Sequence, residues 1–344
     1  MFAVIQNARA SIVWECYILL DDTPQHRFYD LLIAKAQEGV KVKIILDSYG
    51  AFWEDMSNIE ERLRSSGAEV LYFNRLLPWA NHRGFRNWWF TRNHRKVLVV
   101  DERVGFVGGV NIGEAYRKWI DLHMRVEGLV VGNLLRSFAR TYRAVGGRDH
   151  QLLVLAKNPL PMRTRLKTWF ITQDSARRRL SVRTYYREKF KNARERITIV
   201  TPYFMPHRWF LDALSQARRR GVTVEVMIPR NTENRFLTAL NAVFACAARH
   251  KGIRILTGEK MNHAKAMLID GVEGMIGSAN IDANSFDNNW EANLAFRRRD
   301  MVAKLNQTMD RWKLSAKDFD CVGLHHGWLH RFAKIFVGAL HSFL

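Results

Sequence analysis

The 344-residue sequence is poor in cysteine, proline and acidic side chains, and it lacks long hydrophobic runs. Its three cysteines, Cys16, Cys246 and Cys321, are far apart and lack the spacing of a zinc site. We therefore expect no disulfide framework, no metal site and a reducing compartment. No stretch reaches the roughly 18 consecutive apolar residues of a membrane span. Charged residues also interrupt the apolar run that a signal peptide would need near the start.

Positive charge, by contrast, is abundant. The chain has 54 Lys and Arg against 33 Asp and Glu, which gives a formal net charge of +21. Such a charge attracts polyanions, either nucleic acid or the anionic face of a membrane, and composition does not choose between them. With 47% hydrophobic residues the chain can bury a large core, which excludes a disordered or low-complexity protein.

The chain contains an internal repeat. The run NARASIV at 7–13 returns as NARERITIV at 192–200, and EGVKVKIIL at 38–46 returns as RGVTVEVMI at 220–228. Solenoid repeats have periods of only about 20–50 residues. The much longer period found here therefore predicts a duplicated domain.

Within each copy, β-branched runs alternate with stretches of helical spacing. This order predicts an α/β fold with a largely buried sheet in each half. We expect four segments: an N-terminal half at 1–150, a basic linker at 151–182, a C-terminal half at 183–325 and an amphipathic C-terminal helix at 326–344.

Two matching motifs carry the candidate chemistry. NHRKVLVVD at 93–101 is followed by GGVN at 108–111, and NHAKAMLID at 262–270 is followed by GSAN at 277–280. In both, Lys follows His by two residues, Asp follows Lys by five, and the glycine follows that Asp by seven. A lone His-X-Lys is typical of a solvated strand edge, whereas two copies with matched sequels indicate a functional pair.

The spacing has a physical meaning. Residues i and i+2 of a strand point to the same face, so each histidine and its lysine are expected side by side. If the halves pack face to face, two His, two Lys and two Asn converge on one pocket. Imidazole serves as nucleophile or as acid and base near neutral pH, while Lys and Asn supply donors for a phosphate.

This double pattern resembles the phospholipase D superfamily, and the resemblance covers nearly the whole chain. The run GSANIDANS at 277–285, with Glu291 and Asn293 beyond it, is similar to bacterial cardiolipin synthases, as is WIDLH at 119–123. The resemblance implies two pseudo-symmetric halves, each a mixed, mostly parallel sheet flanked by helices. A single active site would lie between them.

The resemblance also implies the reacting groups. His94 would attack phosphorus and form a phosphohistidine, and His263 would protonate the leaving alcohol and then deprotonate the incoming one. Asp121 and Glu291 would hydrogen-bond the imidazoles and fix their tautomers. The non-bridging phosphate oxygens would be held by five donors, Lys96, Lys265, Asn111, Asn280 and, as the weakest, Ser278.

Other parts of the motifs are implied to be structural. Asp101 and Asp270, despite their place in the motifs, would form pairs outside the pocket. The family needs no metal and no other cofactor. Its members usually carry a further strand before the helix that here begins near Phe2, and many have N-terminal membrane spans. We therefore expect either a start further upstream or a first sheet that lacks one edge strand.

Two further segments suit contact with a membrane. The aromatic and basic stretch 79–90 precedes the first motif and has no counterpart of its length in the second half. Its rings and cations suit the headgroup region, although it also fits a loop folded into the core or base stacking on single-stranded nucleic acid. The C-terminal stretch 327–344 suits either an interfacial helix or a helix docked on the protein.

The implied function is transfer of a phosphatidyl group between phospholipids, most simply two phosphatidylglycerols giving cardiolipin and glycerol. The expected partners are anionic phospholipids (phosphatidylglycerol and cardiolipin) and a membrane surface, with no nucleic acid. The expected place is peripheral, on the cytoplasmic face of the bacterial inner membrane. Alternatives are a phospholipase D or phosphodiesterase nuclease that uses water as acceptor, and a non-enzymatic basic binding protein. The resemblance implies that nucleases of the superfamily carry one motif per chain, so two motifs disfavour that branch. Two intact motifs also disfavour a binding protein that has lost its activity.

Overall fold

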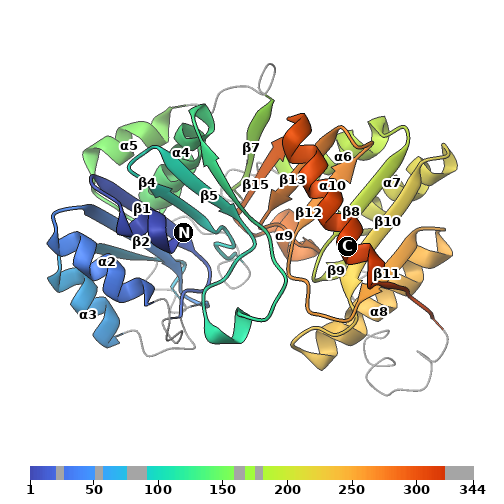
Figure 1. Cartoon of the computed structure of the whole chain (residues 1–344), viewed down its shortest axis with the longest axis horizontal. Coiled ribbons are helices and arrows are strands. Elements are labelled where there is room, and N and C mark those ends of the chain that lie inside the picture. Colours follow the sequence, from blue (N-terminus) through green and yellow to red (C-terminus); the bar gives the residue numbers. More distant parts are fainter. Residues whose placement is uncertain (21–26, 51–56, 76–90, 159–166, 175–180, 322–344) are drawn as a thin grey trace.

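The chain forms two halves that lie side by side, each with a β-sheet and flanking helices (Figure 1). The stretches 79–90 and 327–344 lie outside the described residues. Within the described part, no helix is both long and apolar enough to cross a membrane. The computed structural model describes residues 1–20, 27–50, 57–75, 91–158, 167–174 and 181–321.

The sheet of the first half has the strand order β3-β2-β1-β4-β5-β6. Its strands are β1 (Ser11–Cys16), β2 (Lys41–Asp47), β3 (Glu69–Phe73), β4 (Val97–Val100), β5 (Val104–Gly108) and β6 (His123–Glu127). The helices of this part are α1 (Phe2–Gln6), α2 (Phe28–Gln37), α3 (Ser57–Ser65), α4 (Leu129–Ala144) and α5 (His150–Lys157).

The second sheet has the order β16-β11-β10-β8-β12-β13-β15-β7. Its strands are β7 (Thr168–Gln173), β8 (Arg196–Val200), β10 (Thr223–Pro229), β11 (Arg254–Gly258), β12 (Ala266–Ile269), β13 (Glu273–Gly277), β15 (Glu291–Phe296) and β16 (Lys317–Asp318). A small separate pair is formed by β9 (Phe204–Met205) and β14 (Ile281–Asp282). The helices are α6 (Ser181–Asn192), α7 (Arg208–Arg219), α8 (Arg235–His250), α9 (Ala283–Asp287) and α10 (Arg299–Leu314).

The α/β class and the two repeated halves are confirmed, but the sheets are not mostly parallel. Within the two large sheets, parallel pairing is confined to β3-β2-β1 and to β11-β10-β8, and the other neighbours run antiparallel. The reason is the short turns at 101–103 and 270–272, which join β4 to β5 and β12 to β13. A parallel pair needs a crossover of about a dozen residues or more, so such turns dictate antiparallel hairpins.

The halves differ at one sheet edge. In the second half, β7 pairs with the outer side of β15. No strand among the described residues pairs with the outer side of β6, which is the counterpart of β15 in the first half. Residues 151–182, for which the sequence predicts a linker, contain most of α5 and the whole of β7.

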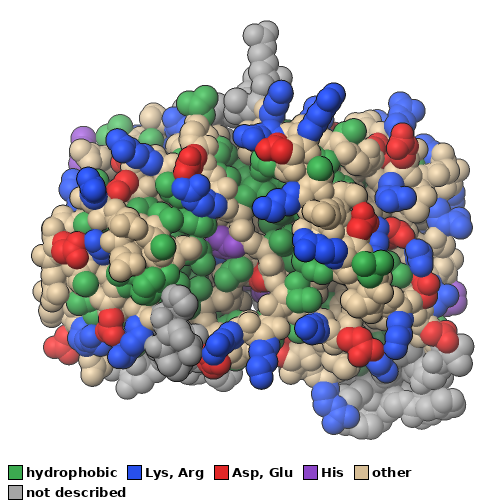
Figure 2. Space-filling view, in the orientation of Figure 1, with side chains coloured by type: hydrophobic (Ala, Val, Ile, Leu, Met, Phe, Trp, Pro, Cys, Tyr) green, Lys and Arg blue, Asp and Glu red, His purple; other side chains and the backbone are tan. Residues whose placement is uncertain are grey.

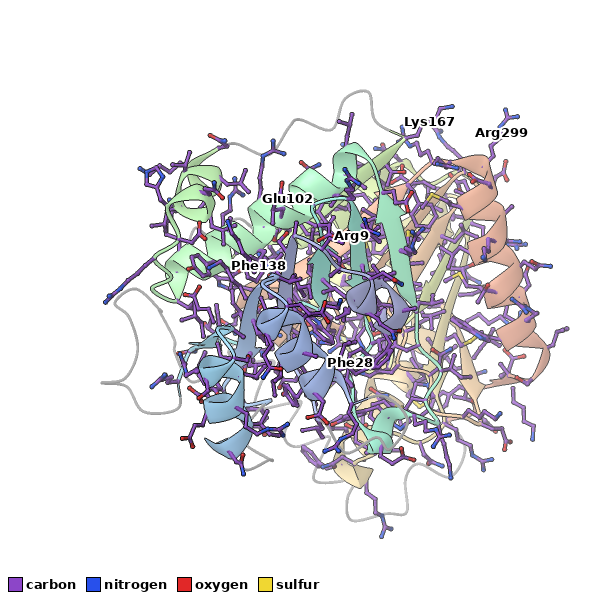
Figure 3. The ribbon with its side chains drawn as sticks, turned by 60° about the vertical axis from the view of Figure 1, so that its left-hand side comes forward. Arg9, Phe28, Glu102, Phe138, Lys167 and Arg299 are labelled. Atoms are coloured by element: carbon purple, nitrogen blue, oxygen red, sulfur yellow. A yellow bond between two sulfur atoms is a disulfide. The ribbon has the colours of Figure 1, made fainter. Side chains whose placement is uncertain are left out.

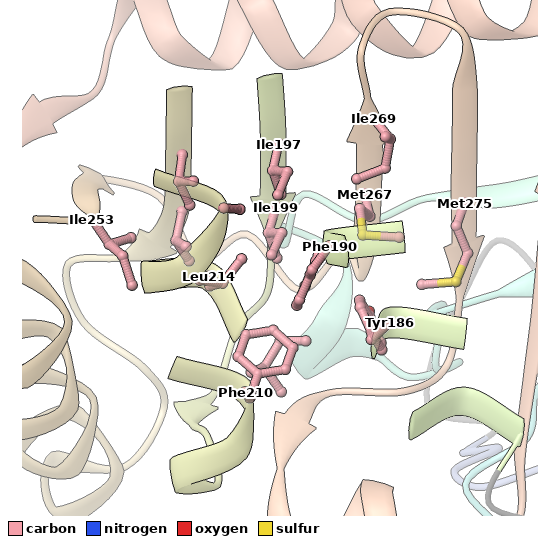
Figure 4. Close-up of a cluster of buried hydrophobic side chains, with 14 of the residues drawn as sticks. Tyr186, Phe190, Ile197, Ile199, Phe210, Leu214, Ile253, Met267, Ile269 and Met275 are labelled. Atoms are coloured by element: carbon pink, nitrogen blue, oxygen red, sulfur yellow. The ribbon is translucent and has the colours of Figure 1, made fainter. Parts of the chain in front are cut away.

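Buried apolar side chains cover the sheets and join the halves. On one face of the second sheet, Phe190 of α6 and Phe210 of α7 pack against Ile199 and other aliphatic residues (Figure 4). A second cluster spans both halves, because Phe138 of α4 lies in one core with Leu294 of β15. Burial of this shared apolar core, which also contains Val97 of β4, holds β4 of the first half in a fixed relation to β15 of the second.

The expectation drawn from the cysteines is wrong. Cys246 of α8 and Cys321 form a disulfide, with Cα atoms 5.7 Å apart, while Cys16 is buried and free. Strand β11 follows α8 in the chain and pairs with β16, and Cys321 lies just after β16. The two cysteines, 75 positions apart, therefore meet in space. Cysteine spacing along the chain does not reveal such a long-range pairing. The expectation of a reducing compartment therefore loses its support.

Candidate active site

Each motif segment is held by the opposite half. The first motif runs into β4, and the backbone N–H of His94 donates to the carbonyl oxygen of Trp290 at 3.0 Å. The second motif runs into β12, and the N–H of His263 donates to the carbonyl oxygen of Ile120 at 2.7 Å. Trp290 and Ile120 each stand directly before a candidate carboxylate. These backbone bonds therefore bring the carboxylate of one half to the histidine of the other.

The two imidazole–carboxylate pairs follow from this exchange. His94 Nδ1 lies 3.3 Å from Glu291 Oε2, and His263 Nδ1 lies 2.8 Å from Asp121 Oδ2. Both histidines and Glu291 are buried. Because the carboxylate engages Nδ1, the Nε2 atom of each ring is the one left for chemistry.

The two lysines lie against the backbone of their own histidines. Lys96 Nζ donates to the carbonyl oxygen of His94 at 2.9 Å, and it lies 4.9 Å from the ring centroid of Tyr17. Lys265 Nζ donates to the carbonyl oxygen of His263 at 2.6 Å and lies 2.8 Å from Nε2 of that ring. Each lysine thus lies against its own histidine, and Lys265 also contacts the ring. Two buried ammonium groups in this site would stabilise an anionic phosphodiester.

Burial and mutual repulsion lower the basicity of these groups. Burial lowers the pKa of Lys96 to about 8 and the pKa of Lys265 to about 7. Burial, followed by the charge of Lys96, lowers the pKa of His94. Burial, followed by the charge of Lys265, holds the pKa of His263 well below its ordinary value. Both imidazoles are therefore neutral near pH 7 in the free protein, as a nucleophile must be.

The two carboxylates are not equivalent. Burial opposes ionisation of Glu291, but His94, Ser278 and Lys96 outweigh it and lower the pKa of this carboxyl. For Asp121, burial outweighs Lys265 and raises the pKa. Glu291 is therefore the more firmly ionised of the two partners.

A glycine and a serine explain part of this difference. The Ser278 hydroxyl donates to Glu291 Oε2 and accepts the backbone N–H of Ala292. The matching position in the first half is Gly109, where an added Cβ would lie 2.4 Å from Asp121 Oδ1. In the second half, Ser278 thus gives Glu291 a hydrogen bond. In the first half, the missing side chain of Gly109 leaves space for Asp121.

The two motif asparagines retain unused acceptors. The side-chain oxygens of Asn111 and Asn280 are buried and accept no hydrogen bond within the described residues. Buried polar atoms are normally paired, so these two are suited to a polar ligand. No cluster of three or more His, Cys, Asp or Glu side chains in the described part of the chain is placed to hold a metal ion.

The motif aspartates lie away from these groups. Asp101 accepts the backbone N–H groups of residues 9–11, and Asp270 accepts those of residues 194–196, where β8 begins. Both have a φ of +51° in the turn between two strands. Figure 3 shows Arg9 and Glu102 near this turn, toward the upper part of the first half. The two aspartates therefore fix the hairpin turns and do not reach the histidines.

Comparison with known families agrees with this arrangement. The family model described as "Cardiolipin synthase, PLD-like domain" matches residues 1–121 and 186–313. The chain belongs to this family. The two matched blocks contain both motifs. The family model therefore covers the histidines His94 and His263 and both carboxylates, Asp121 and Glu291.

Individual relatives are similar over much of the chain. Cardiolipin synthase A of Pseudomonas putida is 31% identical over 302 residues, 86% of this chain and 61% of that protein. The probable cardiolipin synthase YwiE of Bacillus subtilis is 28% identical over 99% of this chain and 69% of its own length. The chain thus spans about 61% of the length of the Pseudomonas relative. In fold, it is similar to phosphatidylserine synthase of Haemophilus influenzae, with a TM-score of 0.74, 15% identity, and coverage of 99% of this chain and 90% of that one.

The structure adds a buried arginine, Arg95, to which the sequence assigned no role. Arg95, between His94 and Lys96, donates to Thr141, to Thr172 and to the carbonyl oxygens of Gln173 and Glu291. Its guanidinium also lies 4.8 Å from the ring centroid of Trp290. The sequence does contain a sign of this difference, because the second motif has Ala264 where the first has Arg95.

A second missed residue braces the first motif from behind. Asp47, at the end of β2, is buried and accepts the backbone N–H of Asn93 at 2.7 Å. Its other oxygen lies 3.5 Å from the guanidinium of Arg92. Burial raises the pKa of Asp47 to about 6. The second half has Pro229 at the end of the matching strand, so this brace exists on one side only.

Proposed function

We propose that this chain is a phosphatidyltransferase that converts two phosphatidylglycerols into cardiolipin and glycerol through a phosphohistidine at His94. The observation that carries the proposal is the crossed pair of imidazoles, each hydrogen-bonded at Nδ1 to a carboxylate of the other half, with a buried lysine against each histidine. The names of the curated relatives support the same reaction class.

In the first step, His94 Nε2 attacks the phosphorus of one phosphatidylglycerol. The N–P bond forms as the P–O bond to the headgroup glycerol breaks, and that oxygen takes a proton from His263. The negative charge of the bound phosphodiester offsets the two lysines, which raises the pKa of His263 from its low value in the free protein. Lys96, Lys265, Asn111 and Asn280 stabilise the charge on the non-bridging oxygens.

In the second step, a headgroup hydroxyl of another phosphatidylglycerol attacks the phosphohistidine. His263 accepts the hydroxyl proton, the new P–O bond forms and the P–N bond to His94 breaks. One phosphodiester is lost and one is gained over the cycle, so the reaction needs no nucleotide. Glu291 and Asp121 hold the two rings in one tautomer throughout.

We also propose that the protein works at an anionic membrane surface, peripherally on the inner membrane of a bacterium. The lipid substrates require access to a bilayer, and a net charge of +21 favours an anionic leaflet. On the face shown in Figure 2, Lys and Arg are spread over both halves with acidic groups among them. No single basic patch stands out in that view.

The test is product analysis of the purified protein on phosphatidylglycerol vesicles in the presence of a chelator. We expect cardiolipin and glycerol from the native chain, and neither from His94→Ala or His263→Ala. Phosphatidic acid as the sole lipid product would make water the acceptor and replace the transferase by a phospholipase D. A parallel lane with single-stranded DNA tests the nuclease alternative, which cut DNA and unchanged lipid would establish.

A further inference from the structure

A cavity of ≈ 530 Å³ lies beside the second histidine. Its polar end is formed by His263, Asp121 and Asn111. The side-chain oxygen of Asn111 is buried and accepts no hydrogen bond from the described residues. A hydroxyl group bound in this end of the cavity would supply the missing donor.

The walls beyond the polar end are largely apolar and aromatic. The ring of Trp119 lies 5.2 Å from the ring of His263, and Tyr116 packs edge-on against Trp119 with centroids 4.9 Å apart. Ile112 and Phe28 are also among the lining residues, and Figure 3 labels Phe28 in the lower part of the first half. A polar end with apolar walls suits an amphipathic ligand better than water.

The other histidine has different surroundings. The ring of Tyr17 packs edge-on against His94 with centroids 5.0 Å apart, and Lys96 lies over Tyr17. His94 is not among the described residues that line the cavity. This cavity therefore lies on the His263 side of the reacting centre.

We infer that this cavity holds the alcohol exchanged at phosphorus, first the leaving glycerol and then the glycerol headgroup of the acceptor lipid. The inference rests on the proposed function, in which His263 handles the proton of both alcohols. Leaving and attacking oxygens lie opposite His94 in an in-line displacement, which is the side of His263. A water molecule occupies about 30 Å³ in the liquid, so the cavity is far larger than hydrolysis requires.

Arg117 supplies the charge that an anionic acceptor needs. It lines the same cavity, is exposed, and has a 3.4 Å contact with Glu114. With the acceptor glycerol at Asn111 and His263, the acceptor's own phosphate would meet this guanidinium at the cavity mouth. The neighbouring Lys118 is exposed and does not line the cavity, which makes it a matched control.

The experiment is a competition for one intermediate. Phosphatidylglycerol vesicles are supplied with ethanol, so the phosphohistidine gives either cardiolipin or phosphatidylethanol. The ratio of these products depends on the second step alone. Because ethanol carries no phosphate, we expect Arg117→Gln to lower the cardiolipin to phosphatidylethanol ratio by about fivefold, with the ratio unchanged in Lys118→Gln.

A second variant tests the cavity by volume. Ile112→Trp fills part of the space and should lower the same ratio by about tenfold, while Leu314→Trp, at an exposed position on α10, should not change it. Equal ratios in the native chain, Arg117→Gln and Ile112→Trp would overturn the inference, as would equal effects of Arg117→Gln and Lys118→Gln. A native chain that forms neither transfer product would instead overturn the proposed function.

Discussion

The two halves bind their histidines by one scheme but surround them differently. Around His94 the chain is braced by Arg95 and Asp47 and closed by Tyr17. In the second half, Ala264 stands at the position of Arg95 and cannot form the same contacts. A cavity lies beside the ring of His263. A duplicated scaffold thus offers two buried imidazoles, of which His263 lines a cavity. In the proposed mechanism His94 is the nucleophile and His263 is the acid–base group.

The largest effect should come from removing the crossed carboxylates. Glu291→Gln and Asp121→Asn keep the side-chain size but lose the charge that orients each ring, so we expect kcat to fall by roughly 10²–10⁴-fold. The melting temperature of each variant should stay within a few degrees of the native value. Equal and full activity in both variants would mean that the carboxylates do not serve the histidines.

Removal of Arg95 should be the largest effect on stability. Arg95→Ala leaves Glu15 buried without its 3.6 Å guanidinium partner and empties the space under Trp290, so the free energy of unfolding should fall by about 3–5 kcal/mol. Urea denaturation measures this change. Ala264→Ser at the matching position should cost far less, and a similar loss in both variants would remove the asymmetry between the halves.

A smaller effect should come from exchanging the residues beside the carboxylates. In Gly109→Ser the new Cβ would lie 2.4 Å from Asp121 Oδ1, so Asp121 must move away from His263 and kcat should fall by about 10²-fold. Ser278→Ala removes one hydrogen bond to Glu291 and should cost about tenfold. Steady-state kinetics on both variants would contradict this account if Ser278→Ala were the more damaging.

The smallest effect is a pH dependence that should separate the two lysines. Their depressed pKa values, about 7 for Lys265 and about 8 for Lys96, mean that each charge is present at lower pH and lost as pH rises through its value. The kcat/KM for an anionic lipid should therefore fall from about pH 7 to above pH 8. Lys265→Arg retains its charge and should shift the start of this fall to higher pH. An unchanged profile would show that lysine charge does not limit the reaction.

Local sequence patterns were sufficient for the repeat and the class of fold. The matched spacing predicted that each His and its Lys lie side by side on a strand, whereas β4 and β12 begin directly after Lys96 and Lys265. The inferences of the repeat and of the fold class succeed because strand periodicity and short motifs depend on neighbours within about ten residues.

Features that depend on distant segments could not be predicted in the same way. Glu291 meets His94 across 197 residues, and Asp121 meets His263 across 142, through backbone pairing between the halves. The disulfide between Cys246 and Cys321 and the cavity beside His263 likewise join segments that are separate in the sequence. The prediction of mostly parallel sheets is wrong, in part because the three-residue turns at 101–103 and 270–272 are too short for the crossover that parallel pairing needs.

The central claim, a division of labour between the two histidines, is tested most directly with a phosphatidyl p-nitrophenyl ester. Its leaving group departs without a proton, so His263→Ala should release one equivalent of p-nitrophenol in a burst and then stall. Mass spectrometry of the stalled protein should find the phosphatidyl group on His94, and His94→Ala should show no burst. A burst in His94→Ala, or a phosphatidyl group on any other residue of the stalled protein, would contradict the account.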